Sequence, residues 1–269
     1  MIYIVNKDCI EFMQGDCSPG NIVHDVVFAD PPDNIGLKYK DSKDTMSYVD
    51  YEIFCRRFIS AGMSIVNRGM WISFNSRHTL MIASAIEEEG DSEWFITPCV
   101  QTITFGNQKN KPGKLTNNYR PLWYISWGES DFNEVREPSW RQQNGDKRAD
   151  PRGKLVSDVF DFPRVTGNSK QRRSWHPTQL NEKLIERCLL LTTHEGDHVL
   201  DIFAGTGTTG RVCRSIGRKC TLVEKSPYYC QKMREELIDG QAYPSGKAST
   251  GASACCASGC DDSAGGGQA

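Results

Sequence analysis

The sequence lacks the features that mark membrane and secreted proteins. No stretch approaches the roughly 18 to 20 consecutive apolar residues that a bilayer-spanning helix needs. The first ten residues, MIYIVNKDCI, lack the basic, apolar and small-residue zones of a signal peptide. We therefore expect a cytoplasmic protein that does not associate with membranes.

Signals for a metal site are also scarce. The chain has 11 cysteines but no paired CxxC spacing of the zinc type, and no cluster of His, Cys and Asp has ligand spacing. In a cytosolic chain such thiols are expected to be small buried side chains rather than disulfide partners. The segment CCASGC (residues 255–260) lacks the remaining ligands. The sequence therefore predicts no metal.

Charge is nearly balanced overall but uneven along the chain. The net charge is −2, yet residues 106–173 contain 14 Lys or Arg against eight Asp or Glu. Lys109, Lys111, Lys114 and Arg120 follow one another without an intervening acid, among several tryptophans. Such a segment could hold a phosphate backbone. It could equally be a solvated surface with a few core aromatics, and the two interpretations stay open here.

Apolar runs alternate with helical patterns along most of the chain. We predict strands at residues 2–5, 23–28, 70–74, 97–105, 121–127, 199–203 and 219–223, and helices at residues 51–65, 76–89, 181–191, 208–216 and 228–238. Alternation of this kind indicates an α/β fold with a doubly wound, mostly parallel sheet covered on both faces.

Two segments depart from this pattern. Residues 128–174 are polar, rich in Arg, Asn, Gly and Pro, and are expected to leave the sheet. Residues 241–269 are small and polar, so they bury too little apolar surface to offset their ordering entropy and are predicted to be disordered. The folded domain is therefore expected to span residues 1–240.

A glycine-rich turn follows the predicted strand at 199–203. Gly205, Gly207 and Gly210 satisfy GxGxxG, and Glu224 ends the next strand, where an acid can hold ribose hydroxyls. A dinucleotide fold would need further strands downstream, but only about one helix and the tail remain. The sheet must be completed from upstream, which sets the strand that ends at Asp30 beside the strand that ends near Phe203.

Three motifs together resemble one protein family. ADPPDN (residues 29–34), WHPTQLNEKLIERCLLLTT (175–193) and DIFAGTGTTG (201–210) are similar, in this order, to the motifs of the β group of DNA amino-methyltransferases. The resemblance covers roughly residues 1–240. It implies a permuted S-adenosylmethionine-dependent methyltransferase fold of seven strands, a target-recognition region within about residues 106–174, double-stranded DNA as partner and a possible homodimer.

The resemblance also implies roles for individual residues. The catalytic motif corresponds to Asp30, Pro31, Pro32 and Asp33. Contact with S-adenosylmethionine is expected from Asp8, Cys9, Asp30, Thr178, Asp201, Phe203, Gly205, Thr206, Gly207, Thr208 and Glu224. Contact with DNA is expected from Tyr39, Lys109, Lys111, Lys114, Arg172 and Arg173.

The implied reaction is site-specific methylation of the exocyclic amino group of a flipped base, with adenine N6 favoured. The alternatives are cytosine N4, a modified base or RNA, and a DNA-binding protein that has lost catalysis. The amino lone pair is conjugated with the ring, so acceptors at Asp30 and the Pro31 carbonyl would have to draw it out of plane. Flipping makes the base accessible.

Asp33 is the main departure from the family pattern, because an aromatic residue that stacks on the base usually stands there. Stacking of this kind contributes about 1 to 3 kcal/mol, which a carboxylate cannot supply. Tyr39 could stack instead, Asp33 could meet another base edge, or the enzyme could be slow or inactive on ordinary bases. The plainer alternative is a turn residue that faces water.

Overall fold

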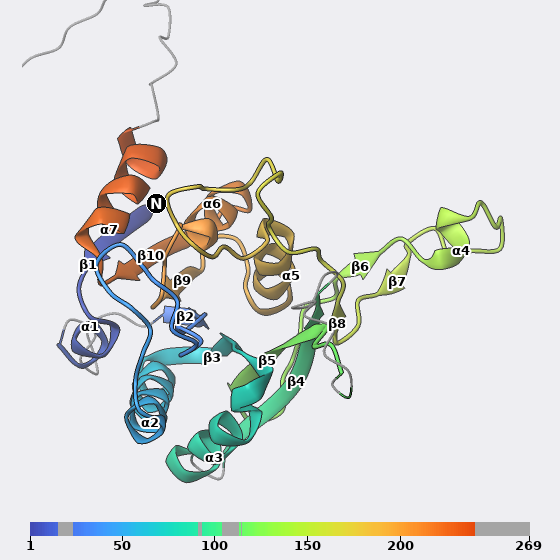
Figure 1. Ribbon diagram of the computed structural model, residues 1–269. Helices are drawn as coiled ribbons and strands as arrows, with labels where there is room; N and C mark the ends of the chain where they lie inside the picture. The colour runs from blue at the N-terminus through green and yellow to red at the C-terminus, as the bar shows by residue number, and fades with distance from the viewer. Residues whose placement is uncertain (16–23, 91–92, 104–112, 114, 240–269) are drawn as a thin grey trace, which may run out of the picture.

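The computed structural model describes residues 1–15, 24–90, 93–103, 113 and 115–239 (Figure 1). The predicted disordered tail, CCASGC and the three lysines of the basic segment lie outside these ranges. Within the described part of the chain, no helix is long and apolar enough to cross a membrane.

An eight-stranded sheet forms the centre of the molecule. Its strand order is β1-β10-β9-β2-β3-β5-β4-β8. The bounds are β1 Ile2–Asn6, β2 His24–Ala29, β3 Val66–Ser73, β4 Trp94–Thr102, β5 Tyr119–Trp127, β8 Val159–Phe160, β9 His198–Asp201 and β10 Lys219–Glu224. The predicted count of seven is wrong by one: β8, which pairs with β4, has only two residues and leaves no readable apolar run.

Pairing within the sheet joins the two ends of the chain. The neighbouring strands β1, β10, β9, β2 and β3 run parallel, whereas β5 runs antiparallel to both β3 and β4. Val26 of β2 lies opposite Val199 of β9, and Ile2 of β1 lies opposite Cys220 of β10. The prediction that upstream strands complete the sheet is confirmed.

Helices cover both faces of the sheet. The central strand β2 is apolar at successive positions, so it presents apolar side chains to both faces. Val27 and Ala29 pack into one core cluster, and Val26 and Phe28 into another on the opposite face. This division follows because successive side chains of a strand point to opposite faces of the sheet. The first face carries α1 (Cys9–Gly15), α2 (Tyr48–Ser64) and α3 (Thr79–Glu89), and the second carries α5 (Glu182–Thr192), α6 (Thr208–Ser215) and α7 (Pro227–Arg234) (Figure 1).

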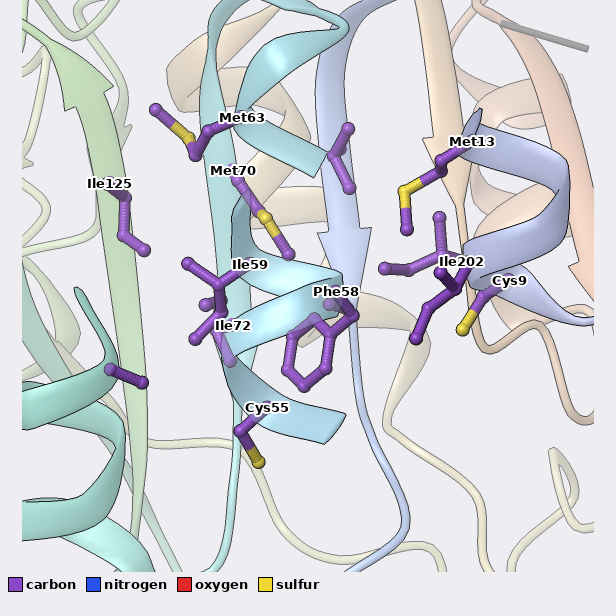
Figure 2. Close-up of a cluster of buried hydrophobic side chains, with 14 of the residues drawn as sticks. Cys9, Met13, Cys55, Phe58, Ile59, Met63, Met70, Ile72, Ile125 and Ile202 are labelled. Carbon is purple, nitrogen blue, oxygen red and sulfur yellow. The ribbon is translucent and has the colours of Figure 1, made fainter. Parts of the chain in front are cut away.

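The core of the first face is built by α2. Its side chains Cys55, Phe58, Ile59 and Met63 recur at helical spacing and face residues of β3 and β5 (Figure 2). Ser47 begins the helix by accepting a hydrogen bond from the Asp50 backbone N–H at 3.1 Å. This packing fixes the start of α2 and thereby the loop that leads to it from β2.

A slender arm extends from the body between β5 and β8. It consists of β6 (Arg136–Glu137), α4 (Trp140–Gln143) and β7 (Lys154–Leu155), with β6 and β7 paired antiparallel (Figure 1). The one-turn helix α4 has a capping box at its start. The arm lies within the segment that was expected to leave the sheet.

Two short helical segments complete the described chain. The 3₁₀ turn η1 (Ser76–His78) connects β3 to α3, and the π-helical segment η2 (Glu235–Asp239) extends α7. The turn η1 stands beside the carboxyl end of β3, where the candidate site lies.

Candidate active site

Three chain segments meet at one edge of the sheet. Asp30 follows β2, Ile202 follows β9 and Glu224 ends β10, all at the carboxyl ends of adjacent parallel strands. Ile202 donates its backbone N–H to the Phe28 carbonyl at 3.2 Å. The expected proximity of the catalytic motif and the glycine turn is therefore confirmed, and it follows from strand order alone.

The glycine turn needs its glycines for two separate reasons. Gly205 and Gly207 have φ angles of 49° and 72°, in the left-handed region that side chains disfavour. A Cβ at Gly205 would also lie 3.3 Å from the ring of His176. Gly207 then begins α6, whose first N–H groups face the same edge of the sheet.

Two buried acids hold the turn in place. Glu224 accepts hydrogen bonds from the backbone N–H groups of Gly205 and Ser226, at 3.0 and 2.8 Å. Asp201 accepts from the backbone N–H of Phe203 at 2.9 Å and from the Thr209 hydroxyl. Burial raises the pKa of both carboxyls, that of Asp201 to about 7. Asp201 is therefore a structural brace of the loop.

The remaining expected cofactor residues line the same edge. Asp8 caps the start of α1 through the Ile10 N–H at 3.0 Å and lies 3.3 Å from the Lys225 ammonium. The Cys9 thiol is buried, and burial raises its pKa to about 12, so it remains protonated. The ring of Phe203 packs edge-on against Phe58.

Two threonines of the loop face away from solvent. The hydroxyls of Thr206 and Thr208 are hydrogen-bonded to each other at 2.8 Å. Arg211 donates to the Thr206 carbonyl and to the Thr208 hydroxyl, each at 2.9 Å. Their side chains therefore stiffen the loop, which leaves backbone N–H groups as the polar groups that a ligand would meet.

The HPTQ segment packs against the glycine turn. The Nδ1 atom of His176 lies 2.6 Å from the Thr178 carbonyl oxygen, and burial lowers the pKa of His176 to about 4. The ring is therefore neutral at physiological pH, as a positioning role requires. Asn181 caps α5 through the Lys183 N–H at 2.9 Å, which confirms the capped helix expected there.

The carboxylate of Asp30 is held by an arginine from a distant strand. The Arg120 Nη2 donates to Asp30 Oδ1 at 2.7 Å, and Arg120 Nη1 donates to both oxygens of Asp33 at 2.9 and 3.0 Å. Arg120 Nε donates to the Ser73 hydroxyl at 2.7 Å. Arg120 stands near the start of β5, and because β5 is antiparallel, its first residues lie where the parallel strands end.

Electrostatics at Asp30 reflect this arrangement. Burial raises the pKa of Asp30, the Arg120 guanidinium lowers it, and the neighbouring Asp33 raises it again, so the balance lies above the usual value. Burial acts to lower the pKa of Arg120, but the two carboxylates raise it, so the guanidinium stays charged. The cluster carries one cation between two acids.

The backbone of the catalytic motif is fixed from the helical side. The Tyr51 hydroxyl donates to the Pro32 carbonyl at 2.7 Å, and His78 Nε2 lies 2.9 Å from the Asp33 carbonyl oxygen. The Asp33 side chain is 22% exposed and ion-paired. The interpretation of Asp33 as a turn residue that faces water is therefore wrong, because its carboxylate is ion-paired with Arg120.

A loop from Asn34 to Met46 leaves the motif and reaches toward α7 before it returns to α2 (Figure 1). Asn34 takes a φ of 51° and exchanges two hydrogen bonds with Met46. At the far end of the loop, the Lys40 N–H donates to the Tyr229 hydroxyl at 2.9 Å. Tyr39 thereby lies with its ring centroid 5.6 Å from that of His176.

Tyr39 also lies close to the catalytic acids. Burial raises its pKa, and the charges of Asp30, Asp44 and Asp33 raise it further. The expected aromatic substitute for Asp33 therefore lies near both Asp30 and His176. Whether it stacks on a base stays a prediction.

The two expected DNA-binding arginines lie at the HPTQ segment. Arg173 is ion-paired with Glu236, so its guanidinium is already neutralised. Arg172 donates from Nη2 to the Pro177 carbonyl at 3.2 Å, and its Nη1 is buried without a partner among the described residues. Neither presents a free guanidinium on the surface.

Sequence reasoning missed four residues of this site. Arg120 was grouped with the surface lysines, and Ser73, Tyr51 and His78 were given no site role. A signal did exist for Arg120: an acid replaces an aromatic at position 33, and an arginine stands at the start of a buried strand. An additional buried acid calls for a buried cation.

Comparison with known proteins assigns the family. A family model described as DNA methylase, N6_N4_Mtase, matches residues 24–235. The chain belongs to this family. A type II methyltransferase of Streptococcus pneumoniae, M2.DpnII, is 28% identical over 257 residues, covering 87% of this chain and 88% of that protein. M2.LlaDCHI, a type II methyltransferase of Lactococcus lactis subsp. cremoris, is 26% identical over 251 residues, covering 81% of this chain and 84% of that protein.

Solved structures show the same fold. M1.HpyAVI in complex with SAM has a TM-score of 0.64 and 21% identity, covering 88% of this chain and all of that one. The PvuII cytosine-N4-specific DNA methyltransferase has a TM-score of 0.67 and 14% identity, covering 89% and 87%. This DNA methylase therefore has the S-adenosylmethionine-dependent methyltransferase fold, and the β-group resemblance is confirmed. It is a DNA methyltransferase.

Proposed function

We propose that this DNA methylase modifies the exocyclic amino nitrogen of a base flipped out of double-stranded DNA, with adenine N6 as the favoured target. The observation that carries the proposal is the shared edge of the sheet, where the Asp30 carboxylate and the Gly205 turn follow adjacent strands. An acceptor for an amino group and a loop for a nucleoside-containing cofactor thus face one cleft.

The loop residues fit S-adenosylmethionine. Gly205 and Gly207 give the loop the left-handed backbone of a tight turn, and Glu224 offers a carboxylate to ribose hydroxyls at the end of β10. Asp8 and Cys9 would lie toward adenine, with Phe203 on the apolar side and Thr178 toward the methionine end. When bound, the cofactor supplies a methyl carbon on a sulfonium, which is open to attack by a neutral amine.

Asp30 and the prolines would prepare the amine. Asp30 accepts one amino hydrogen and the Pro31 carbonyl accepts the other, which turns the lone pair out of the base plane and toward the cofactor. Proline fixes φ and removes the N–H that would compete. Tyr51 holds the next carbonyl, that of Pro32, so the backbone of the motif is set before the base arrives. The proton leaves only after the nitrogen has been methylated.

Tyr39 and the arm would hold the DNA. Tyr39 replaces the missing aromatic at position 33 as the stacking surface for the flipped base. The arm carries six basic residues against three acids between residues 136 and 155, and Trp140 is 74% exposed on α4. Exposed cations and an exposed indole on a projecting element suit contact with phosphates and bases.

The proposal is tested with purified protein, S-adenosylmethionine labelled in its methyl group and unmethylated duplex DNA, followed by digestion to nucleosides. We expect label in N6-methyldeoxyadenosine. Label in N4-methyldeoxycytidine would overturn the choice of adenine but not the reaction. Label only in RNA, or in DNA that already carries modified bases, would overturn the substrate. DNA binding without any transfer would overturn catalysis.

A further inference from the structure

All three nitrogens of the Arg120 guanidinium form hydrogen bonds within the site. A guanidinium has five N–H donors, and the structure gives Arg120 five hydrogen bonds: two to Asp33, one to Asp30, one to the Ser73 hydroxyl and one to the Ser73 carbonyl at 3.4 Å. The side chain is 16% exposed. The Arg120 guanidinium is therefore held inside the site by its partners, unlike an exposed cation.

The geometry of these bonds makes Asp30 depend on Asp33. Both oxygens of Asp33 accept from the same nitrogen, Nη1, which fixes the position of that nitrogen. Asp33 binds Nη1 from one side and Ser73 binds Nε from the other, so Nη2 is left with one orientation, 2.7 Å from Asp30 Oδ1. That bond and a hydrogen bond from Ser73 use part of the acceptor capacity of the Asp30 carboxylate, and its remaining lone pairs can accept from the amino group of a base.

We propose that Asp33 and Arg120 are positioning residues of this DNA methylase: Asp33 anchors Arg120, and Arg120 orients the Asp30 carboxylate and keeps it ionised. The inference rests on the proposed function, in which Asp30 accepts an amino hydrogen. The inference explains why an acid stands at position 33 in place of the usual aromatic residue: Asp33 is the ion-pair partner of Arg120 on β5.

Charge balance explains why both members are needed. Without Arg120, Asp30 and Asp33 would be two like charges in a buried site, and one of them would take up a proton. A protonated Asp30 would offer a donor where the amino group needs an acceptor. Without Asp33, the guanidinium would lose its bidentate partner and could turn away from Asp30.

Titration of the Asp30 carboxyl tests this without relying on turnover. In protein labelled with ¹³C at aspartate carboxyl carbons, we expect the midpoint of the Asp30 resonance to move to higher pH in Arg120→Gln. We expect the same direction in Asp33→Leu, which has no acceptor. If Asp33 acted only as a neighbouring negative charge, removing it would move the midpoint to lower pH, and that result would overturn the anchoring role.

Steady-state kinetics provide the second measurement. We expect Arg120→Gln and Asp33→Leu to lower kcat at least tenfold with KM for S-adenosylmethionine within twofold, and to move the acidic limb of the kcat profile to higher pH. Arg120→Lys keeps the charge but not the fork, so kcat should fall while the acidic limb moves less. Unchanged kcat in both of the first two variants would overturn the proposal.

A matched control separates these effects from a general loss of stability. Arg68→Gln breaks a different ion pair, that of Arg68 on β3 with Asp197 at 2.9 Å, at the opposite edge of the sheet. It should leave kcat and the Asp30 midpoint unchanged. If the wild-type protein transfers no methyl group to any nucleic acid, the proposed function fails, while the titration still decides whether Asp33 anchors Arg120.

Discussion

The two ends of β2 bury polar side chains under opposite conditions. At its carboxyl end, Asp30 is surrounded by Arg120 and Ser73, and its charge is matched. At its first residue, His24 is 1% exposed, its ring lies 4.6 Å from that of His198, and neither of its ring nitrogens has a partner among the described residues. Burial lowers the pKa of His24 to about 4, and His198 adds to this.

The comparison shows that a buried group loses its charge unless a charged partner stabilises it. Unpaired burial forces a titratable group into its neutral form, whereas a charged hydrogen-bonded partner opposes that shift. The two groups also differ in depth, because His24 is 1% exposed whereas the Asp30 side chain is 26% exposed, so burial and neighbours together separate them. The proposed function requires the charge at Asp30 only.

The largest effect on the rate of methyl transfer is expected at the carboxyl end of β2. Asp30→Asn should lower the rate of methyl transfer on the order of 10²-fold or more, because an amide that turns its NH₂ toward the base cannot accept an amino hydrogen. Binding of S-adenosylmethionine, measured by calorimetry, should change less than threefold. A variant that retains more than a tenth of the wild-type rate would remove Asp30 from the mechanism.

The next effect concerns stability at the other end. His24 binds a proton more readily when unfolded, with a pKa near 6.5, than when folded. Its contribution to stability is therefore complete above about pH 6.5 and is lost as the pH falls toward 4, on the order of 3 kcal/mol in total. His24→Phe should reduce this acid-induced loss, as measured by urea unfolding at pH 7 and pH 5.

The exposed His194 provides the control for this measurement. Its replacement by glutamine should leave the difference in unfolding free energy between pH 7 and pH 5 as in the wild type. An equal pH dependence in the wild type and in His24→Phe would show that the imidazole at the start of β2 accepts a proton while the protein stays folded.

The smallest effect is expected for a cation that is exposed and has no ion-pair partner among the described residues. Arg141 lies on the arm, and its replacement by alanine should weaken DNA binding modestly. The slope of log K against log salt concentration should fall by about one, as for the loss of a single phosphate contact. Fluorescence anisotropy over a salt series measures this slope. An unchanged slope would place the arm away from the DNA backbone.

The elements that position the site could be predicted from the sequence because each has a local signal. The apolar run before Asp30 and the run before Gly205 predicted β2 and β9, and the requirement for further strands predicted their adjacency. Period-two burial on both faces leaves long apolar runs that few other structures produce. The glycine turn could also be predicted from a local pattern, namely its glycine spacing and the acid Glu224 at the end of the next strand.

The remaining features depend on contacts that leave no local pattern. Arg120 reaches Asp30 across 90 sequence positions, and nothing near residue 120 indicates which acid it faces. β3 begins at Val66 rather than at the predicted Met70, because Asn67, Arg68 and Gly69 interrupt its apolar run while Arg68 pairs with Asp197. The seven-residue helix α1 is too short for its periodicity to stand out.

Pairing of β1 with β10 has a consequence for synthesis on the ribosome. Ile2 finds its partner at Cys220, and β2 finds its neighbour β9 near residue 199. At 5 to 20 residues per second, roughly 10 to 40 s separate the emergence of these partners. The edges of β1 and β2 stay unpaired until β9 and β10 emerge, so an incomplete nascent chain cannot assemble the site.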